Sequence, residues 1–257
     1  MKVRELLDLS GRVALVSGGS RGLGLAMAAA LAEMGARVAI TARKTAELAE
    51  AQALLKQEGH EVATLVSDLS RSEAAKPLVE GVMAQLGPID ILVNNAGTSW
   101  GAPAEEYPLD AWRKVIDLNL TGTWELTRQV AASCMIPRGY GRIINIASIA
   151  ALRGSTGDFK AVAYSASKGG IVSLTRALAG EWGAHGIAVN AICPGFIPSK
   201  MSRGILQSIG AAVIEATPLH QLGCDDDMKG IIVLLAGAAA RHITGQVFTV
   251  DGGITAV

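Results

Sequence analysis

A tyrosine and a lysine stand four residues apart in AYSASKGGIVSLTRALAGEWG, at Tyr164 and Lys168. The small and apolar residues of this segment predict a helix over residues 162–183, and a four-residue interval places both side chains on one helical face. A phenol can donate or accept a proton, and a cation one turn away favours its phenolate form. The pair therefore predicts acid–base chemistry, although an isolated pair of this kind is more often a surface contact.

A glycine-rich turn follows the first predicted strand, in VALVSGGSRGLGLAM. Gly18, Gly22 and Gly24 have the spacing G-x-x-x-G-x-G. Glycine permits positive φ angles and a close approach to the backbone, and the N–H groups at a helix N-terminus favour a pyrophosphate. A glycine turn alone also fits ordinary loop chemistry, but its place directly after the first strand predicts dinucleotide binding.

The end of the second predicted strand indicates which dinucleotide is bound. In VAITARKTAEL no carboxylate directly follows the strand, whereas Arg43 and Lys44 do, and Arg21 lies inside the glycine turn. NAD binders usually place an acidic residue near the ribose 2′-OH, and arginine accommodates a 2′-phosphate. The cations predict NADP(H) in preference to NAD(H). The alternative is that Arg43 and Lys44 only decorate an exposed helix start.

Short β-branched runs alternate with longer alanine-rich segments of helical periodicity. The predicted strands are 12–17, 37–40, 62–66, 89–94, 142–147, 187–192 and 246–250, and the predicted helices are 22–34, 45–58, 71–86, 110–135, 162–183 and 226–240. This alternation predicts βαβ units, and continuous apolar strands predict a sheet covered on both faces. We expect one α/β domain over residues 1–257, a doubly wound Rossmann fold with a mostly parallel seven-stranded sheet, in which residues 198–218 form a lid.

Composition excludes several classes of function. Lysine and arginine number 23 and aspartate and glutamate 23, and this balance disfavours nucleic-acid binding through a broad positive field. The four histidines lack ligand spacing, so we expect no metal site. The three cysteines form no disulfide framework, and the longest apolar run, 231–240, is about half of the roughly 20 residues that span a membrane. With no signal peptide expected in MKVRELLDLSGRVALVS, we expect a cytoplasmic protein that binds no membrane.

Eight motifs occur in a fixed order along the chain. They are SGGSRGLG (17–24), SDL (67–69), NNAG (94–97), DLNLTG (117–122), NIAS (145–148), YSASK (164–168), NAICPGF (190–196) and ITGQVFTVDGG (243–253). In these motifs the chain resembles the short-chain dehydrogenases/reductases over essentially its whole length. The resemblance implies an oxidoreductase that transfers hydride between a nicotinamide cofactor and a ketone or secondary alcohol.

The resemblance also implies four catalytic residues. Tyr164 would protonate the forming alkoxide in ketone reduction, and Lys168 would lower the pKa of its phenol and hold the nicotinamide ribose. Ser148 would hydrogen-bond the substrate carbonyl, and Asn119, within the 110–135 helix, would hold a water that relays protons from Lys168. Without the surrounding motifs, Ser148 would be interpreted as a turn or cap serine and Asn119 as a core amide.

Cofactor contacts implied by the same resemblance extend along the chain. They are Gly18, Ser20, Arg21, Gly22, Leu23, Gly24, Arg43, Lys44, Asp68, Leu69, Asn95, Ala96, Gly97, Tyr164, Lys168, Pro194, Gly195, Ile197 and Ser199. The chain departs from the family at two places. Ser199 stands where a threonine is frequent, and a small insertion near 154–161 lengthens the interval between Ser148 and Tyr164.

Two enzymatic interpretations and one of another class remain. The first is an NADP(H)-dependent reductase of 3-oxoacyl thioesters, and the second is a polyol or keto-sugar-acid dehydrogenase similar to gluconate 5-dehydrogenase. A non-catalytic regulator that senses the dinucleotide is the third, which the four catalytic residues argue against. The resemblance further implies a homotetramer or homodimer formed through the 110–135 and 162–183 helices.

Overall fold

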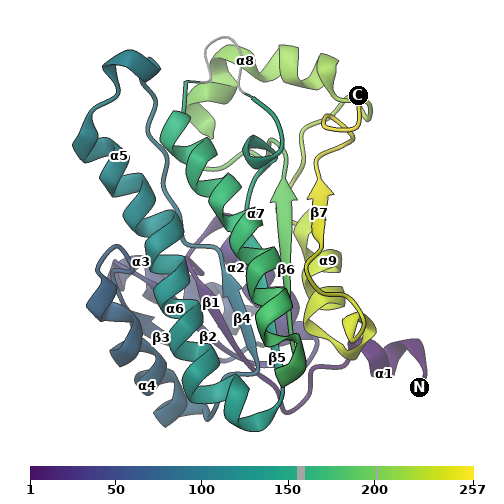
Figure 1. Cartoon of the computed structure of the whole chain (residues 1–257). Helices are drawn as coiled ribbons and strands as arrows, with labels where there is room; N and C mark the ends of the chain where they lie inside the picture. Colours follow the sequence, from purple (N-terminus) through teal and green to yellow (C-terminus); the bar gives the residue numbers. More distant parts are fainter. Residues whose placement is uncertain (155–159, 201) are drawn as a thin grey trace.

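Seven parallel strands form the centre of the computed structural model, which describes residues 1–154, 160–200 and 202–257. The strand order is β3-β2-β1-β4-β5-β6-β7 (Figure 1). The strands are β1 (Val13–Ser17), β2 (Arg37–Ala42), β3 (Val62–Val66), β4 (Ile91–Asn94), β5 (Gly141–Ile146), β6 (Ile187–Pro194) and β7 (Val247–Val250). Because β1 lies between β2 and β4, the order reverses at the end of β1, where doubly wound sheets bind ligands. The predicted Rossmann fold is confirmed.

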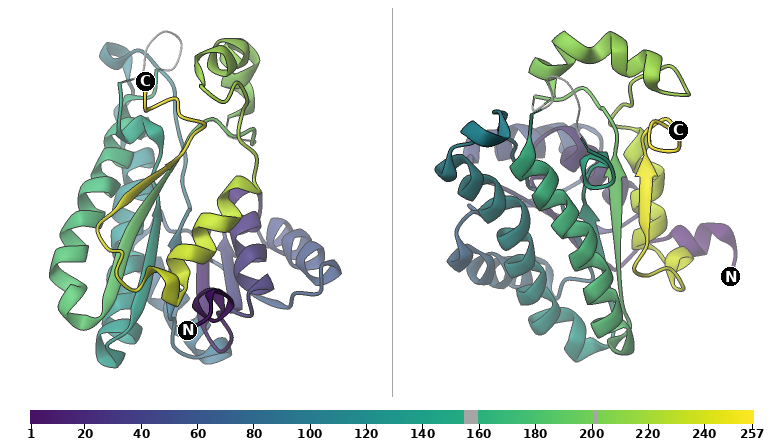
Figure 2. Two further views of the ribbon diagram at one scale, coloured as in Figure 1. Left: turned by 90° about the vertical axis from the view of Figure 1, so that its right-hand side faces the viewer. Right: turned by 45° about the horizontal axis from the view of Figure 1, so that its top comes forward.

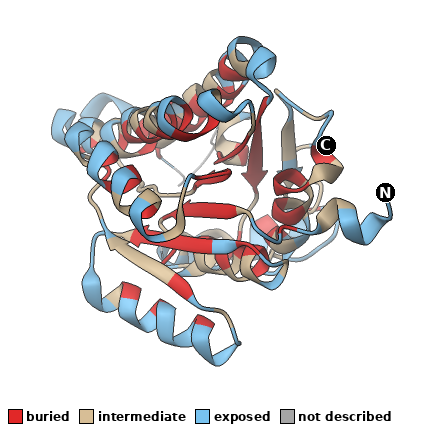
Figure 3. Cartoon of the chain, turned by 90° about the horizontal axis from the view of Figure 1, so that it is seen from below, coloured by how far each residue is buried: buried red, intermediate tan, exposed pale blue. Residues whose placement is uncertain are grey.

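Helices cover both faces of the sheet. They are α1 (Val3–Leu7), α2 (Gly22–Glu33), α3 (Thr45–Gln57), α4 (Ala75–Leu86), α5 (Leu109–Ile116), α6 (Thr123–Val130), α7 (Val162–Trp182), α8 (Arg203–Ala216) and α9 (Asp227–Ala236). Side chains of α2, α3 and α9 share one buried cluster with one face, and those of α4, α6 and α7 share a second cluster with the other. Figure 2 shows the two layers from the side, and Figure 3 shows the buried strands between helices whose outer faces are exposed.

The predicted helix over 110–135 is present but irregular. Between α5 and α6, residues Asp117–Gly122 form a π-helical stretch, and Ala131–Met135 form a second one after α6. A π-helical turn bonds each N–H to the carbonyl five residues back, one residue further than in an α-helix, and such stretches are frequent at functional sites. The first stretch contains Asn119. Periodicity alone does not reveal this, because the apolar pattern shifts by only one residue.

Two further differences lie near the ends of the chain. The short helix α1 was not predicted, and α9 ends at Ala236, four residues before the predicted end. A Cβ at Gly237 would lie 2.6 Å from the Leu6 carbonyl oxygen, so this glycine lets the end of α9 approach α1 closely. No helix in the described part of the chain is both long and apolar enough to cross a membrane.

Candidate active site

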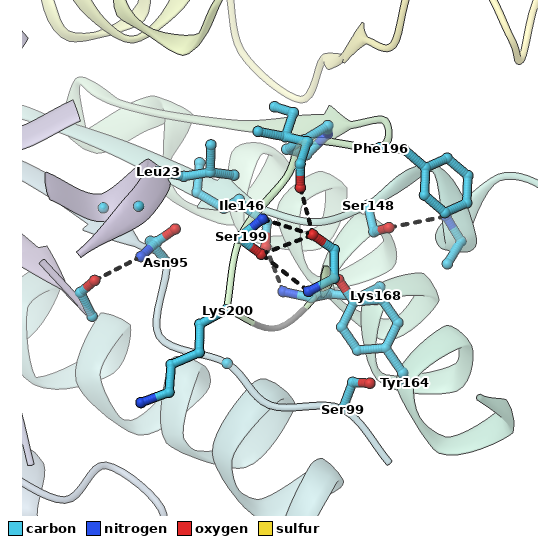
Figure 4. A pocket seen from close by; sticks show the side chains of 18 of the residues that line it. Leu23, Asn95, Ser99, Ile146, Ser148, Tyr164, Lys168, Phe196, Ser199 and Lys200 are labelled. Carbon is cyan, nitrogen blue, oxygen red and sulfur yellow. Dashed lines mark hydrogen bonds between the residues drawn. The ribbon is translucent and has the colours of Figure 1, made fainter. Parts of the chain in front are cut away.

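Tyr164 and Lys168 lie in the first two turns of α7, as the spacing predicted. The Lys168 ammonium is 5.7 Å from the centroid of the Tyr164 ring, and Lys168 is buried while Tyr164 as a whole residue is half-buried. Lys168 Nζ donates a hydrogen bond of 2.6 Å to the Ile146 carbonyl oxygen at the end of β5. This bond anchors the ammonium beside Tyr164, and Figure 4 shows both side chains in the cavity.

Burial is the main influence on the ionisation of this pair. Burial raises the pKa of Tyr164, the Ser148 hydroxyl opposes that shift by hydrogen bonding, and the nearby Cys193 thiol adds to it. In the protein alone desolvation dominates and the Lys168 ammonium points to Ile146, so the lowering of the phenol pKa by Lys168 together with an oxidised nicotinamide stays a prediction for the complex. A raised pKa keeps the phenol protonated at neutral pH, which is the form that donates a proton.

The lysine is shifted in the opposite sense. Burial lowers the pKa of Lys168 to about 8, because a cation loses its hydration inside the protein. The partial charge of Cys193 opposes this shift, and the Ile146 carbonyl supplies a hydrogen-bond acceptor. Lys168 can therefore exchange a proton near neutral pH, which an exposed lysine rarely does.

Ser148 follows β5 directly, and its side chain lines the same cavity as Tyr164. Its hydroxyl oxygen accepts a hydrogen bond of 3.1 Å from the Ala150 N–H and thereby caps the short helix Ile149–Ala151. The hydroxyl also acts on the pKa of Tyr164. Ser148 is thus a cap and a neighbour of the phenol at once, so its hydroxyl lies beside the position where a substrate oxygen would meet Tyr164.

Asn119 lies one layer behind the cavity and is 1% exposed. Its Oδ1 accepts from the Thr98 N–H at 2.8 Å, and its Nδ2 donates to the Thr98 carbonyl at 2.9 Å and to Ser167 Oγ at 3.0 Å. Both amide hydrogens are therefore used. A Cβ at Gly97 would lie 3.4 Å from Asn119 Oδ1 and 3.7 Å from Lys168 Nζ, so glycine leaves the space between these two residues open.

The glycine turn lies at the carboxyl end of β1, opposite the NNAG motif. Gly18 and Gly22 have φ angles of 64° and 50°, which favour glycine. A Cβ at Gly24 would overlap the Gly18 carbonyl oxygen and lie 2.5 Å from Asn95 Nδ2. A Cβ at Gly22 would instead point into open space. The turn therefore packs tightly against the protein at Gly24 and leaves free space on its cavity side at Gly22.

Asn95 holds this turn in place. Its Nδ2 donates to the carbonyl oxygens of Ser17 and Gly18, both at 3.1 Å, while its backbone N–H and that of Ala96 donate to Ser17 Oγ. The helix that follows, α2, has no side-chain hydrogen bond capping its N-terminus. Its first N–H groups therefore remain free to bind an anion.

Cations surround the end of β2, and one carboxylate lies among them. Arg21 NH1 and Lys44 Nζ contact the same oxygen of Glu47, Oε1, at 2.9 and 3.1 Å, and Arg43 lies beside them at the cavity edge. Glu47 is on α3, in the first helical turn after the strand. Our sequence interpretation missed it because it looked for an acid directly at the strand end.

One cavity of about 1270 Å³ joins these features. Of the predicted catalytic and cofactor residues, it is lined by all except Asn119 and Asp68. The Asp68 carboxylate accepts from the Ser70 N–H and hydroxyl, whereas its neighbours Ser67 and Leu69 line the cavity. Ser199 lines it too, but its hydroxyl pairs with that of Ser202 at 3.1 Å.

Polar groups in this cavity are suited to a polar ligand. Thr41 Oγ1, Ser67 Oγ and Asp225 Oδ1 line it, are buried, and have no hydrogen-bond partner among the described residues. Buried polar atoms rarely stay without a partner in folded proteins. Together with the open glycine turn and the cations, they fit a phosphorylated dinucleotide lying from β3 to Tyr164.

The other end of the cavity is apolar. Helix α8 lies beyond the carboxyl ends of β6 and β7 in Figures 1 and 2, and its residues 205, 209, 212, 213 and 216 face the cavity. The apolar lining on this side consists of Ile149, Phe196, Ile205, Ile209, Ala212, Val213, Ala216 and Ile254. Arg153 precedes the predicted insertion and Lys160 lies within it, and both line the cavity at this end, while residues 155–159 of the insertion lie outside the described residues. The periodicity of the sequence did not predict which face of the 198–218 segment turns its apolar side chains toward the site.

A family model described as enoyl-(acyl carrier protein) reductase matches residues 18–255. The chain belongs to the short-chain dehydrogenase/reductase family. It is 36% identical to gluconate 5-dehydrogenase of Gluconobacter oxydans (98% of this chain, 97% of the relative). It is 41% identical to acetoacetyl-CoA reductase of Shinella zoogloeoides (94% and 98%). Because these relatives are named as enzymes, they support the prediction of an enzyme over that of a non-catalytic regulator.

The fold agrees with solved structures over its full length. A gluconate 5-dehydrogenase from Burkholderia cenocepacia, solved in complex with NADP and tartrate, superposes with a TM-score of 0.93 at 32% identity and covers 100% of both chains. The protein is thus an oxidoreductase of this family, and its similarity spans dehydrogenases of sugar acids and reductases of 3-oxoacyl thioesters.

Proposed function

We propose that the protein reduces the ketone of a 3-oxoacyl thioester with NADPH, and oxidises the corresponding alcohol in reverse. One observation carries this proposal: a single cavity runs from the glycine turn and its cations, past Ser148, Tyr164 and Lys168, to the apolar face of α8. The proposal therefore assigns the nucleotide to one end and an apolar acyl chain to the other.

The chain's own residues supply the proton chemistry. Bound NADPH provides the hydride, while the raised pKa of Tyr164 keeps its phenol ready to protonate the substrate oxygen. Ser148 donates a hydrogen bond to the same oxygen. Lys168, with its pKa lowered to about 8, returns a proton to Tyr164. Because the amide hydrogens of Asn119 are taken by Thr98 and Ser167, only an oxygen of Asn119 can hold the proposed relay water.

Charge supports NADP(H) as the nucleotide. Arg21, Arg43 and Lys44 gather at the end of β2, where the 2′-phosphate of a dinucleotide would lie, and Lys44 and Arg43 are exposed to the cavity. Arginine binds phosphate with its planar fork, and lysine binds it as a point charge. NADP complexes of similar structures agree with this choice.

The apolar lining supports an acyl chain as substrate. A polyhydroxylated sugar acid would place its hydroxyl groups against Phe196, Ile205 and Ile209, where they would have no hydrogen-bond partner. Burying such unpaired hydroxyl groups costs free energy, whereas burying an alkyl chain at the same place does not. An alkyl chain gains about 0.8 kcal/mol for each methylene that it buries. Arg153 and Lys160 at the rim would then face the phosphate groups of a carrier.

Those same two cations favour a second candidate. A keto-sugar acid carries a carboxylate, which Arg153 or Lys160 can bind, and a gluconate 5-dehydrogenase is among the relatives. Arg153 is well placed for this, since its NH1 donates to the Ile254 carbonyl at 3.1 Å and so is fixed at the cavity.

The oxidation of NADPH or NADH at 340 nm distinguishes the two candidates. We expect rapid consumption of NADPH with acetoacetyl-CoA, slower consumption with NADH, and little with 5-keto-gluconate. A preference for 5-keto-gluconate would contradict the thioester proposal and support the second candidate. No oxidation with either substrate would contradict both substrate proposals.

We further infer that the protein forms a homotetramer or homodimer through α5, α6 and α7. Exposed positions on α7 carry small residues, among them Ala166, Ser173, Ala177 and Gly180, and a Cβ at Gly180 would meet no atom within 4 Å. Small residues allow the helices of two copies to approach closely. Light scattering after size-exclusion chromatography tests this, and a monomer at micromolar concentration would contradict it.

A further inference from the structure

Glu47 lies among the cations of the proposed phosphate site. Its Oε1 accepts from Arg21 NH1 at 2.9 Å and from Lys44 Nζ at 3.1 Å. The Glu47 side chain is 24% exposed, against 55% for Arg21 and 65% for Lys44. The carboxylate is thus the more enclosed partner, and it holds together two cations from different elements, the glycine turn and the start of α3.

Glu47 is an anion at neutral pH. Its hydrogen bond with Lys44 lowers its pKa, partial burial opposes that shift, and the charges of Arg21 and Lys200 add to it. Lys200 lies just before α8, next to Ser199, which is hydrogen-bonded to Ser202. Cations from three parts of the chain therefore act on this one carboxylate, which lines the cavity.

We propose that Glu47 determines nucleotide specificity by occupying, as an internal anion, the cations that bind the 2′-phosphate of NADPH. This inference depends on the proposed NADP(H) function. A 2′-phosphate carries acceptor oxygens and negative charge to the same position, so it competes with Glu47 for Arg21 and Lys44. A ribose 2′-OH has no such charge and can donate to the carboxylate. Glu47 therefore weakens NADPH binding and strengthens NADH binding.

The test is Glu47→Gln, which removes the charge and keeps the size of the side chain. A half-exposed ion pair is worth up to about 1 kcal/mol of interaction free energy, which corresponds to roughly a fivefold change in a dissociation constant. We therefore expect the ratio of the dissociation constant of NADH to that of NADPH to rise roughly fivefold. Glu50→Gln is the matched control, because Glu50 is an exposed carboxylate on the same helix that does not line the cavity. It should leave the ratio unchanged.

Isothermal titration calorimetry gives these constants without turnover, using NADPH, NADH, 2′-AMP and 5′-AMP as ligands and thermal unfolding as a check of folding. We expect Glu47→Gln to bind 2′-AMP more tightly and 5′-AMP more weakly than the parent protein does. Equal weakening of NADPH and NADH would show that Glu47 only braces Arg21, and would overturn this inference alone, as would an unchanged ratio. Failure of the parent protein to bind either dinucleotide would overturn the proposed function as well.

Discussion

The two ends of the main cavity are built in different ways. At the nucleotide end, the glycine turn and the NNAG segment are held by hydrogen bonds between side chains and backbone at the ends of β1 and β4, made by Asn95 and Ser17. At the substrate end, the wall comes from α8, the C-terminal segment and the chain around Arg153. The first end depends on local conformation at strand ends. The second depends on how distant segments pack over the sheet.

The largest effect that we expect concerns the point where the two ends meet. Tyr164→Phe removes the proton donor and keeps the ring, so turnover should fall by about 10³-fold, within the range for general acids. The dissociation constant of NADPH should change little, because the phenyl ring and Lys168 remain. Steady-state rates and calorimetry measure the two quantities.

Tyr140→Phe is a suitable control for that variant, since the Tyr140 ring lies between Arg12 and Arg142, 4.1 and 4.7 Å from their guanidinium carbons, and does not line the cavity. It should keep turnover near that of the parent. Turnover of Tyr164→Phe within a few-fold of the parent would contradict the role of the phenol.

A substitution in the glycine turn tests the packing at the nucleotide end of the cavity. Gly24→Ala places a methyl group against the Gly18 carbonyl and Asn95 Nδ2, and overpacking of this kind costs about 1–3 kcal/mol. We expect a lower midpoint of urea unfolding and weaker NADPH binding. Gly230→Ala in α9, where a Cβ meets nothing within 4 Å, should instead stabilise the protein by up to about 1 kcal/mol. Equal midpoints for both variants would contradict the close packing of the turn.

The pH dependence of stability tests the burial of Lys168. With its pKa at about 8 in the folded protein, against 10.5 for an unperturbed lysine, the folded state binds fewer protons than the unfolded state between these values. The free energy of unfolding should therefore rise with pH in this window, by about 1–3 kcal/mol relative to Lys168→Met. Urea titrations of both proteins at pH 7, 8 and 9.5 measure this difference. A constant difference would show that Lys168 is not desolvated.

The substrate end should respond more weakly and in another way. Ile209→Asn adds a polar group to the apolar face of α8, and the loss of one apolar contact changes discrimination by about 1–2 kcal/mol. We expect kcat/KM for 3-oxooctanoyl-CoA to fall about tenfold with little change for acetoacetyl-CoA. An equal fall for both thioesters would indicate that α8 does not contact the acyl chain.

Sequence patterns revealed the two ends unequally. Gly18, Gly22, Tyr164 and Lys168 could be predicted because turns and helical spacing fix their positions locally. The apolar face of α8 and the carboxylate of Glu47 could not, because each acquires its meaning from residues distant in the chain: Ile254 and Phe196 for α8, and Arg21 for Glu47. The burial that raises the pKa of Tyr164 could not be predicted for the same reason, since burial is a property of the packed site.

The most direct test of a cavity divided between nucleotide and acyl chain is the kcat/KM of the parent protein, with NADPH, for 3-oxoacyl-CoA substrates of four, six and eight carbons and for 5-keto-gluconate. We predict that kcat/KM rises by up to about 200-fold from four to eight carbons, because four further buried methylenes contribute about 0.8 kcal/mol each, and that 5-keto-gluconate is the poorest substrate. A profile that is flat or falls with chain length, with 5-keto-gluconate preferred, would contradict the assignment of the apolar end to an acyl chain.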